Sequence, residues 1–285
     1  MGILAESAAV CRRFGSFTAV SGVDIAVSGG EVVGLLGANG AGKTTLIRLL
    51  LGLAEPTQGT VALFGSLPSI ATRRRVGYVP QTLGLYAGLT VAQNWSFTAA
   101  AFGTHAPLPA RIAGWRRELV GGLPLGAQRQ VAFAVALSHE PELLVLDEPT
   151  SGVSPLGRAR LWEEIRSAAS RGAGVLVTTH YMEEAEQCDR LLVMAAGRVV
   201  AAGTASQIVG GRTVAEARCE DNNRAFTVLD EGGIAVQLLG GAVRASAEPG
   251  AVSALLSGAG IDADVSLVPA NLEEAFVDIV TSRAA

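Results

Sequence analysis

The chain has 285 residues, of which 49% are hydrophobic and 17% charged, with a net charge of −4. One domain per about 150 residues predicts two domains, and this hydrophobic content excludes an intrinsically disordered chain. The acidic surplus argues against nucleic-acid binding, which usually needs a basic surplus. The longest apolar run, residues 131–137, is far shorter than the ~18–20 residues of a membrane span, and the N-terminus lacks a signal-peptide pattern.

Cysteine usage predicts the compartment of the protein. Cys11, Cys188 and Cys219 lie far apart and form no CxxC or Cys/His cluster. This pattern is typical of reduced thiols in a cytoplasmic protein, and it disfavours a disulfide framework or structural zinc.

A glycine-rich segment, residues 37–44, matches the phosphate-binding pattern G-x-x-x-x-G-K-[ST] at every fixed position. An apolar run typical of a buried strand precedes it, and apolar residues at helical spacing follow it. Lys43, the only lysine among 22 basic residues, is predicted to reach the β- and γ-phosphates, and the Thr44 hydroxyl to bind Mg²⁺. The predicted nucleotide-binding residues of this segment are Gly37, Asn39, Gly40, Ala41, Gly42, Lys43, Thr44 and Thr45.

Two carboxylates end a second apolar run, residues 143–146. This pattern predicts a buried parallel strand whose C-terminal end meets the nucleotide. Asp147 is predicted to hold Mg²⁺, directly or through water, and Glu148 to polarise the attacking water. A third strand, residues 174–179, ends at His180, which is predicted to hydrogen-bond the γ-phosphate and orient the base.

The lysine count also narrows the class of P-loop protein. A small GTPase needs an Asn-Lys-x-Asp element, and the only lysine already lies in the phosphate-binding loop. A small-molecule kinase would carry a mobile lid and lack the motifs further along the chain.

From about residue 5 to residue 205, the sequence resembles the ATP-binding subunits of ABC transporters. The resemblance rests on GANGAGKTT, YVPQ, LDEPTSGV, TTHYMEEAEQCDRLLVM and AGRVVAAGT, in that order. It implies an α/β fold, with a P-loop ATPase core over residues 1–208 and a helical subdomain at about 82–138. It further implies ATP hydrolysis with ATP and Mg²⁺ as cofactors. By resemblance, Gln81 contacts Mg²⁺ and the attacking water, and Phe14 stacks on adenine, with Phe17 as the alternative.

Two stretches, TTHYMEEAE and VPANLEEAFVDIV, resemble the ATPases of drug and antibiotic exporters. This implies a multidrug-efflux role, a separate integral-membrane permease as partner, and a peripheral location on the inner face of the cell membrane. The groove for the permease is predicted to be lined by Leu85, Tyr86 and Leu89, with Trp95 and Phe97 in a helix beneath. The alternative is that these five residues form ordinary subdomain core.

ABC ATPases work as head-to-tail dimers in which a Leu-Ser-Gly-Gly-Gln signature faces the partner's ATP. Here Pro124 replaces the serine and removes one backbone donor, while the N–H groups of Gly126 and Ala127 are expected to face the phosphate. Ser154 replaces the usual aspartate but remains a good N-cap before Pro155. We expect a weakened or variant site rather than a dead one, in a homodimer or heterodimer. The alternative is a weakly hydrolysing, regulatory half of an asymmetric heterodimer. The aligned signature residues are Leu123, Pro124, Leu125, Gly126, Ala127 and Gln128.

Beyond a hairpin at residues 197–203 and a Gly210-Gly211 linker, residues 209–285 are predicted to form a small α+β accessory or regulatory domain. A helix is expected from Leu272, with Asn271 as N-cap and Glu274 three residues later. The acidic residues of this domain are expected to be solvated rather than ligands: Glu220, Asp221, Asp230 and Glu231. Strands are predicted at 225–229, 242–245 and 264–268, and a further helix at 251–256.

Overall fold

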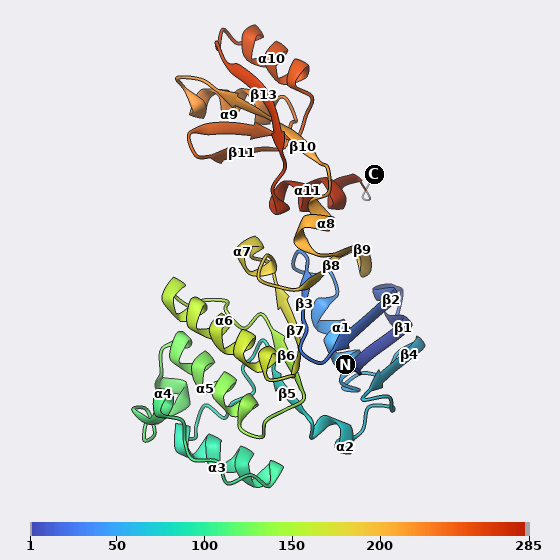
Figure 1. Ribbon diagram of the computed structural model, residues 1–285, viewed down its shortest axis with the longest axis vertical. Helices are drawn as coiled ribbons and strands as arrows, with labels where there is room; N and C mark the ends of the chain where they lie inside the picture. The colour runs from blue at the N-terminus through green and yellow to red at the C-terminus, as the bar shows by residue number, and fades with distance from the viewer. Residues whose placement is uncertain (1, 283–285) are drawn as a thin grey trace. The chain divides into compact units, whose positions relative to one another are not determined.

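The computed structural model describes residues 2–282, which divide into two compact units, residues 2–204 and 205–282 (Figure 1). The boundary lies four residues before the expected end of the ATPase domain at residue 208. Gly210 and Gly211, the expected linker, instead follow helix α8 (Ala205–Val209) inside the second unit. Among the described residues, no helix has both the length and the apolar character needed to span a membrane.

A six-stranded sheet forms the centre of the first unit, in the order β5-β6-β7-β3-β8-β9. Its first five strands are parallel, and β9 pairs antiparallel with β8, which places the expected hairpin at this edge. Strands β3, β6 and β7 are buried at every position because layers cover both faces of the sheet. The strands are β3 (Val32–Leu36), β5 (Val76–Val79), β6 (Leu143–Asp147), β7 (Gly174–Thr179), β8 (Arg190–Ala195) and β9 (Arg198–Gly203).

Helix α1 (Lys43–Leu50) packs between this sheet and a three-stranded antiparallel sheet of order β2-β1-β4. Its apolar residues recur at helical spacing, so Leu46, Ile47 and Leu49 all reach the shared core. Figure 1 shows α5 and α6 on the other side of the six-stranded sheet. The remaining elements of these layers are β1 (Ile3–Phe14), β2 (Phe17–Ser28), β4 (Gln58–Leu63), α2 (Ile70–Arg73), α6 (Pro155–Ser170) and α7 (Met182–Ala185).

Helices occupy the range expected for the helical subdomain. The first of them begins with a capping box, in which Thr90 Oγ1 accepts from the Gln93 N–H at 3.2 Å and Gln93 Oε1 accepts from the Thr90 N–H at 2.8 Å. Trp95 is buried in the subdomain core, where its indole N–H donates to the Ala106 carbonyl at 2.9 Å. The elements are α3 (Val91–Phe102), α4 (Ala110–Ala113), a 3₁₀ turn (Val120–Gly122) and α5 (Leu125–Leu137).

The second unit contains a β-α-β-β-α-β arrangement whose antiparallel sheet has the order β11-β12-β10-β13. Helices α9 and α10 pack on one face of this sheet and close a separate apolar core. The four acidic residues predicted to be solvated are all exposed: Glu220, Asp221, Asp230 and Glu231. The elements are β10 (Thr213–Arg218), α9 (Asn222–Glu231), β11 (Val236–Leu239), β12 (Ala242–Ala245), α10 (Pro249–Gly258), β13 (Asp264–Pro269) and α11 (Leu272–Ser282).

One predicted element of this unit is wrong, because residues 225–229 lie in helix α9 rather than in a strand. Ala225 and Leu229 are both fully buried, and a spacing of four places them on one face of a helix. Asp221 caps the helix by accepting from the Arg224 N–H at 3.0 Å. The other predicted strands and helices of this unit are confirmed, including the Asn271–Glu274 capping box, with reciprocal bonds of 2.8 and 2.7 Å.

Candidate functional site

The phosphate-binding loop joins β3 to α1. Neighbouring backbone lies so close to the loop that two of its positions require glycine. Gly42 has φ +101°, and a Cβ there would lie 2.4 Å from the Ala19 carbonyl oxygen. A Cβ at Gly37 would lie 2.5 Å from the Met194 carbonyl oxygen. Neither position can hold a side chain, so the loop depends on glycine at both positions.

Lys43 turns its amine into the loop. Its Nζ donates to the carbonyl oxygens of Gly37 at 2.6 Å and Ala38 at 3.1 Å. Burial lowers the pKa of the Lys43 amine, and the nearby Glu148 and Asp147 carboxylates oppose that shift. The N–H groups of Lys43 and the next two residues precede the first intrahelical bond, from the Leu46 N–H to the Gly42 carbonyl at 2.9 Å. The loop therefore combines helix N–H groups with a cation, a combination that suits a phosphate.

The Glu148 carboxylate lies among three of the predicted site residues. Its Oε2 accepts from Gln81 Nε2 at 3.4 Å, and its Oε1 lies 4.0 Å from Lys43 Nζ and 3.8 Å from His180 Nδ1. Each of the four residues follows a different strand of the parallel sheet, at its carboxyl end or in the loop beyond. The sheet therefore brings together residues that the sequence places up to 137 positions apart, from 43 to 180.

Asp147 leaves one carboxylate oxygen available for a cation. The residue is 1% exposed, its Oδ1 accepts from Thr178 Oγ1 at 2.7 Å, and Oδ2 has no hydrogen-bond partner among residues 2–282. Thr44 is exposed in the first turn of α1 and carries a hydroxyl. These hard oxygen donors fit Mg²⁺. In that same range no three His, Cys, Asp or Glu side chains converge as a metal site, so a cation here would complete its shell with phosphate and water.

Two residues that the sequence analysis did not identify hold the backbone of Glu148. Glu148 adopts a left-handed conformation with φ +50°. Its N–H donates to Thr178 Oγ1 at 2.8 Å, and its carbonyl accepts from Arg129 Nη1 at 2.8 Å. The available signal was weak: Thr178 is one of two threonines that end a mostly apolar strand, and Arg129 resembled any other helical arginine.

Glu184 is a third residue that the sequence analysis missed. Its fully buried carboxylate accepts from Thr150 Oγ1 at 2.6 Å and from Thr179 Oγ1 at 2.7 Å, and it lies 3.3 Å from Arg158 Nε. These contacts tie the loop after Glu148 to the end of β7, next to His180. The network therefore fixes two of the segments that carry predicted site residues.

The variant signature differs in detail from the expectation. Pro124 is the N-cap of α5, with no side-chain capping bond. The Ala127 N–H donates to the Pro124 carbonyl at 2.9 Å, so the expectation that this group faces a phosphate is wrong. The first turn of α5 uses the Ala127 N–H group for its own hydrogen bond. The N–H groups of Leu125 and Gly126 come before this first hydrogen bond of the helix.

Ser154 performs the structural role predicted for it. Its Oγ accepts from the Gly157 N–H at 3.3 Å, and Pro155 occupies the first helical position of α6. The capping function of this position is confirmed.

Phe14 lies at the exposed end of β1, with 52% of its surface accessible, so it is not a core aromatic. The Arg12 guanidinium lies 4.6 Å from the centre of its ring. Phe17 is opposite Phe14 in the hairpin and is 63% exposed. Both aromatic rings are accessible for stacking on a base.

We expect Phe14→Ala to weaken ATP binding by about 1–3 kcal/mol, the usual contribution of one base–aromatic stack. Phe17→Ala, directly after the two-residue turn, is the matched control and should change the Kd little. Calorimetric titration with Mg-ATP measures both. A larger effect at Phe17 would assign the stacking role to that residue instead.

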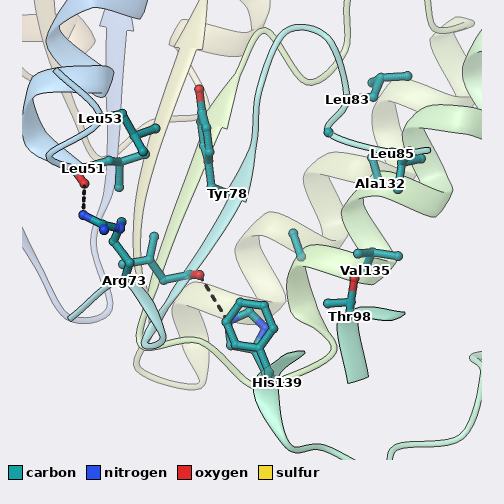
Figure 2. Close-up of a pocket in the computed structure, with 14 residues that line it drawn as sticks. Leu51, Leu53, Arg73, Tyr78, Leu83, Leu85, Thr98, Ala132, Val135 and His139 are labelled. Atoms are coloured by element: carbon teal, nitrogen blue, oxygen red, sulfur yellow. Dashed lines mark hydrogen bonds between the residues drawn. The ribbon is translucent and has the colours of Figure 1, made fainter. Parts of the chain in front are cut away.

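A cavity of 260 Å³ lies between the strands of the six-stranded sheet and the helical subdomain of the first unit. Figure 2 shows Leu53 and Arg73 on one side of it, and Leu83, Leu85 and Val135 on the other. The lining is mostly apolar, and the few polar groups include His139, whose Nε2 contacts the Val76 carbonyl at 3.2 Å. This cavity is the groove of the first unit that best fits the expected docking site.

The residues predicted to form the docking groove lie in different environments. Leu85 lines the cavity, and Trp95 is buried in the subdomain core, in α3, the helix that also carries Phe97. Tyr86 and Phe97 are both exposed and contact each other edge to face, with ring centres 5.1 Å apart. Leu89 is half-buried outside the cavity lining. Leu85 therefore fits the interpretation as a groove residue, and Trp95 fits the alternative of ordinary subdomain core.

Known proteins similar to this chain come from one large group. The family model described as "ABC transporter" matches residues 20–151, and one described as "AAA domain, putative AbiEii toxin, Type IV TA system" matches residues 120–184. "Nod factor export ATP-binding protein I" of Burkholderia orbicola (strain AU 1054) is 43% identical over 212 residues, which cover 70% of each chain.

Two further proteins extend the comparison. "Probable multidrug ABC transporter ATP-binding protein YbhF" of Escherichia coli (strain K12) is 40% identical over 212 residues, 70% of this chain but 37% of that protein's length. A solved structure of an ATP-binding subunit of an ABC transporter matches with a TM-score of 0.67 and 31% identity, over 72% of this chain and 91% of that one.

Proposed function

Because this chain belongs to the family of ABC transporter ATP-binding proteins, we propose that it hydrolyses ATP to energise an exporter through a separate membrane permease. The observation that carries the proposal is the position of the Glu148 carboxylate, within 4.0 Å of Lys43, Gln81 and His180. A carboxylate beside a phosphate-binding lysine is arranged to activate water next to a terminal phosphate.

Each residue of the cluster has a distinct part in this reaction. Lys43 and the N–H groups at the start of α1 bind the phosphates, and the Glu148 carboxylate accepts a proton from the attacking water. Gln81 and His180 orient the carboxylate and the water from two sides. Thr44, Gln81 and Asp147 would hold Mg²⁺, which supplies charge neutralisation of the phosphates when bound.

We propose that two ATPase subunits share each ATP, since family resemblance implies a head-to-tail dimer. The signature of one subunit would offer the Leu125 and Gly126 N–H groups to the partner's ATP, aided by the dipole of α5. Pro124 supplies no hydroxyl there, which favours the alternative of a weakly hydrolysing half in a heterodimer. In that case this chain would keep its own P-loop and Glu148 and borrow an ordinary signature.

The cavity of Figure 2 supports a docking site for the permease. Its apolar lining, which includes Leu53 and Val135, suits an apolar side chain on a cytoplasmic segment of that partner. Docking there would place this chain in the cytoplasm, peripheral on the inner face of the membrane. The named relatives concern multidrug transport and Nod factor export, and the permease would choose the substrate.

Steady-state ATP hydrolysis by the purified chain, with and without Mg²⁺, tests the proposal. Mg²⁺-dependent turnover is the expected result and would favour a working homodimer. Tight Mg-ATP binding without turnover would favour the heterodimer alternative. Absence of Mg-ATP binding would contradict both.

A further inference from the structure

Arg129 is a buried cation in the second turn of α5, the helix that begins at the signature segment. It is 6% exposed, and its Nη1 donates to the Glu148 carbonyl oxygen at 2.8 Å. Burial lowers the pKa of its guanidinium, and the charge of Glu148 opposes that shift. A buried guanidinium is costly unless it is hydrogen-bonded. The Glu148 carbonyl accepts one such bond, while Arg129 Nε has no hydrogen-bond partner among residues 2–282.

The contact falls on a strained point of the backbone. Glu148 has φ +50°, a conformation that residues with a side chain adopt rarely. Thr178 Oγ1 holds the N–H of this residue at 2.8 Å, and Arg129 holds its carbonyl. The two peptide groups that flank the strained residue are therefore both fixed. Release of either one would let the backbone relax and move the carboxylate away from Gln81 and His180.

We propose that Arg129 is a positioning residue that holds Glu148 of its own subunit in the geometry for hydrolysis. The inference rests on the proposed function. In the proposed dimer, α5 begins at the signature that faces the partner's ATP, while Glu148 serves the ATP of its own subunit. Arg129 then links the two ATP sites by one hydrogen bond, in a chain whose Ser154 lacks the charge of the usual aspartate.

Arg129→Met keeps a similar apolar volume and removes the donor. We expect kcat for ATP to fall about 10- to 100-fold, as for loss of a hydrogen bond from a charged group. The Kd for Mg-ATP should stay within about twofold, because Lys43 and the loop are untouched. Arg129→Lys, which keeps a cationic donor, should recover part of the loss.

Arg190→Met is the matched control. Arg190 is also partly buried, donates to Glu31 Oε1 at 2.8 Å and contacts the Ala26 carbonyl, but it lies at the start of β8, three strands away from β6. It should lower the melting temperature and leave kcat unchanged. If Arg129→Met does not fold, Arg129→Leu, which also removes the donor and keeps an apolar side chain, provides the same comparison.

Mixed dimers of two differently tagged full-length chains separate the proposed role from a role in the signature. One pair combines a wild-type subunit with a subunit carrying both E148Q and R129M. The other places E148Q and R129M in opposite subunits. If Arg129 serves its own Glu148, the first pair keeps one intact site and the second keeps none. Equal turnover of the two pairs, or more in the second, would overturn the proposal.

The kcat and Kd of the unmixed wild-type and Arg129→Met proteins separate the remaining outcomes. Wild-type turnover with unchanged kcat in Arg129→Met overturns the positioning role alone. Parallel loss of kcat and Mg-ATP affinity, like that of a merely destabilised protein, also overturns it. An inactive wild-type chain instead contradicts the proposed function, and this inference falls with it.

Discussion

Glu148→Gln should reduce ATP turnover by about 10²- to 10⁴-fold, the usual contribution of a general base. The amide has nearly the same shape as the carboxylate, but it cannot accept the proton of the attacking water. Lys43, Thr44 and Asp147 remain in place, so the variant should bind Mg-ATP and accumulate in the ATP-bound dimer. Phosphate release measures the first effect, and light scattering during gel filtration with Mg-ATP measures the second.

Glu142→Gln is the matched control for this experiment. Glu142 carries the same side chain and lies just before the same strand, where it bonds Arg75 Nε at 2.6 Å on an exposed surface. This variant should keep normal turnover and show no trapped dimer. Normal turnover in Glu148→Gln would contradict the role of Glu148 as the base.

Lys43→Ala should weaken Mg-ATP binding by about 100-fold or more, since hydrogen bonds to charged groups each contribute about 1.5–3 kcal/mol. Lys43 provides the only amine of the loop, and its Nζ already lies within 3.1 Å of the Gly37 and Ala38 carbonyl oxygens. No other lysine exists in the chain to replace it. Calorimetric titration measures the affinity.

Arg48→Ala tests whether the loss is specific to the loop. Arg48 is an exposed cation on the same helix, near its end, so its removal should leave the affinity for Mg-ATP unchanged. Thermal melting of both variants shows whether the fold persists. Unchanged affinity in a folded Lys43→Ala protein would contradict the assignment of the loop.

Local patterns in the sequence determined the phosphate-binding loop and the strands that lead to the site. A glycine at φ +101° and a lysine at the start of a helix are properties of a few adjacent residues. Apolar runs such as 143–146 and 175–177 are short and continuous, as strands of a covered parallel sheet require. The capping box at Asn271 and the N-cap at Ser154 were equally local, and both are confirmed.

The errors arose where a local pattern permits two structures. Ala225 and Leu229 lie in a short apolar stretch that fits a strand or a helix, and packing on the sheet of the second unit decided for the helix. At Ala127, the tight first turn of α5 used an N–H group that the motif alone left available.

The sequence by itself predicted a set of nucleotide-binding residues and determined at which strand ends they stand. Only the tertiary structure decided what holds them in place. Arg129 reaches Glu148 across 19 positions, Thr178 reaches it across 30, and Thr150 reaches Glu184 across 34. No periodicity encodes such pairs, because each depends on which strands lie side by side and on the need of a buried polar group for a partner.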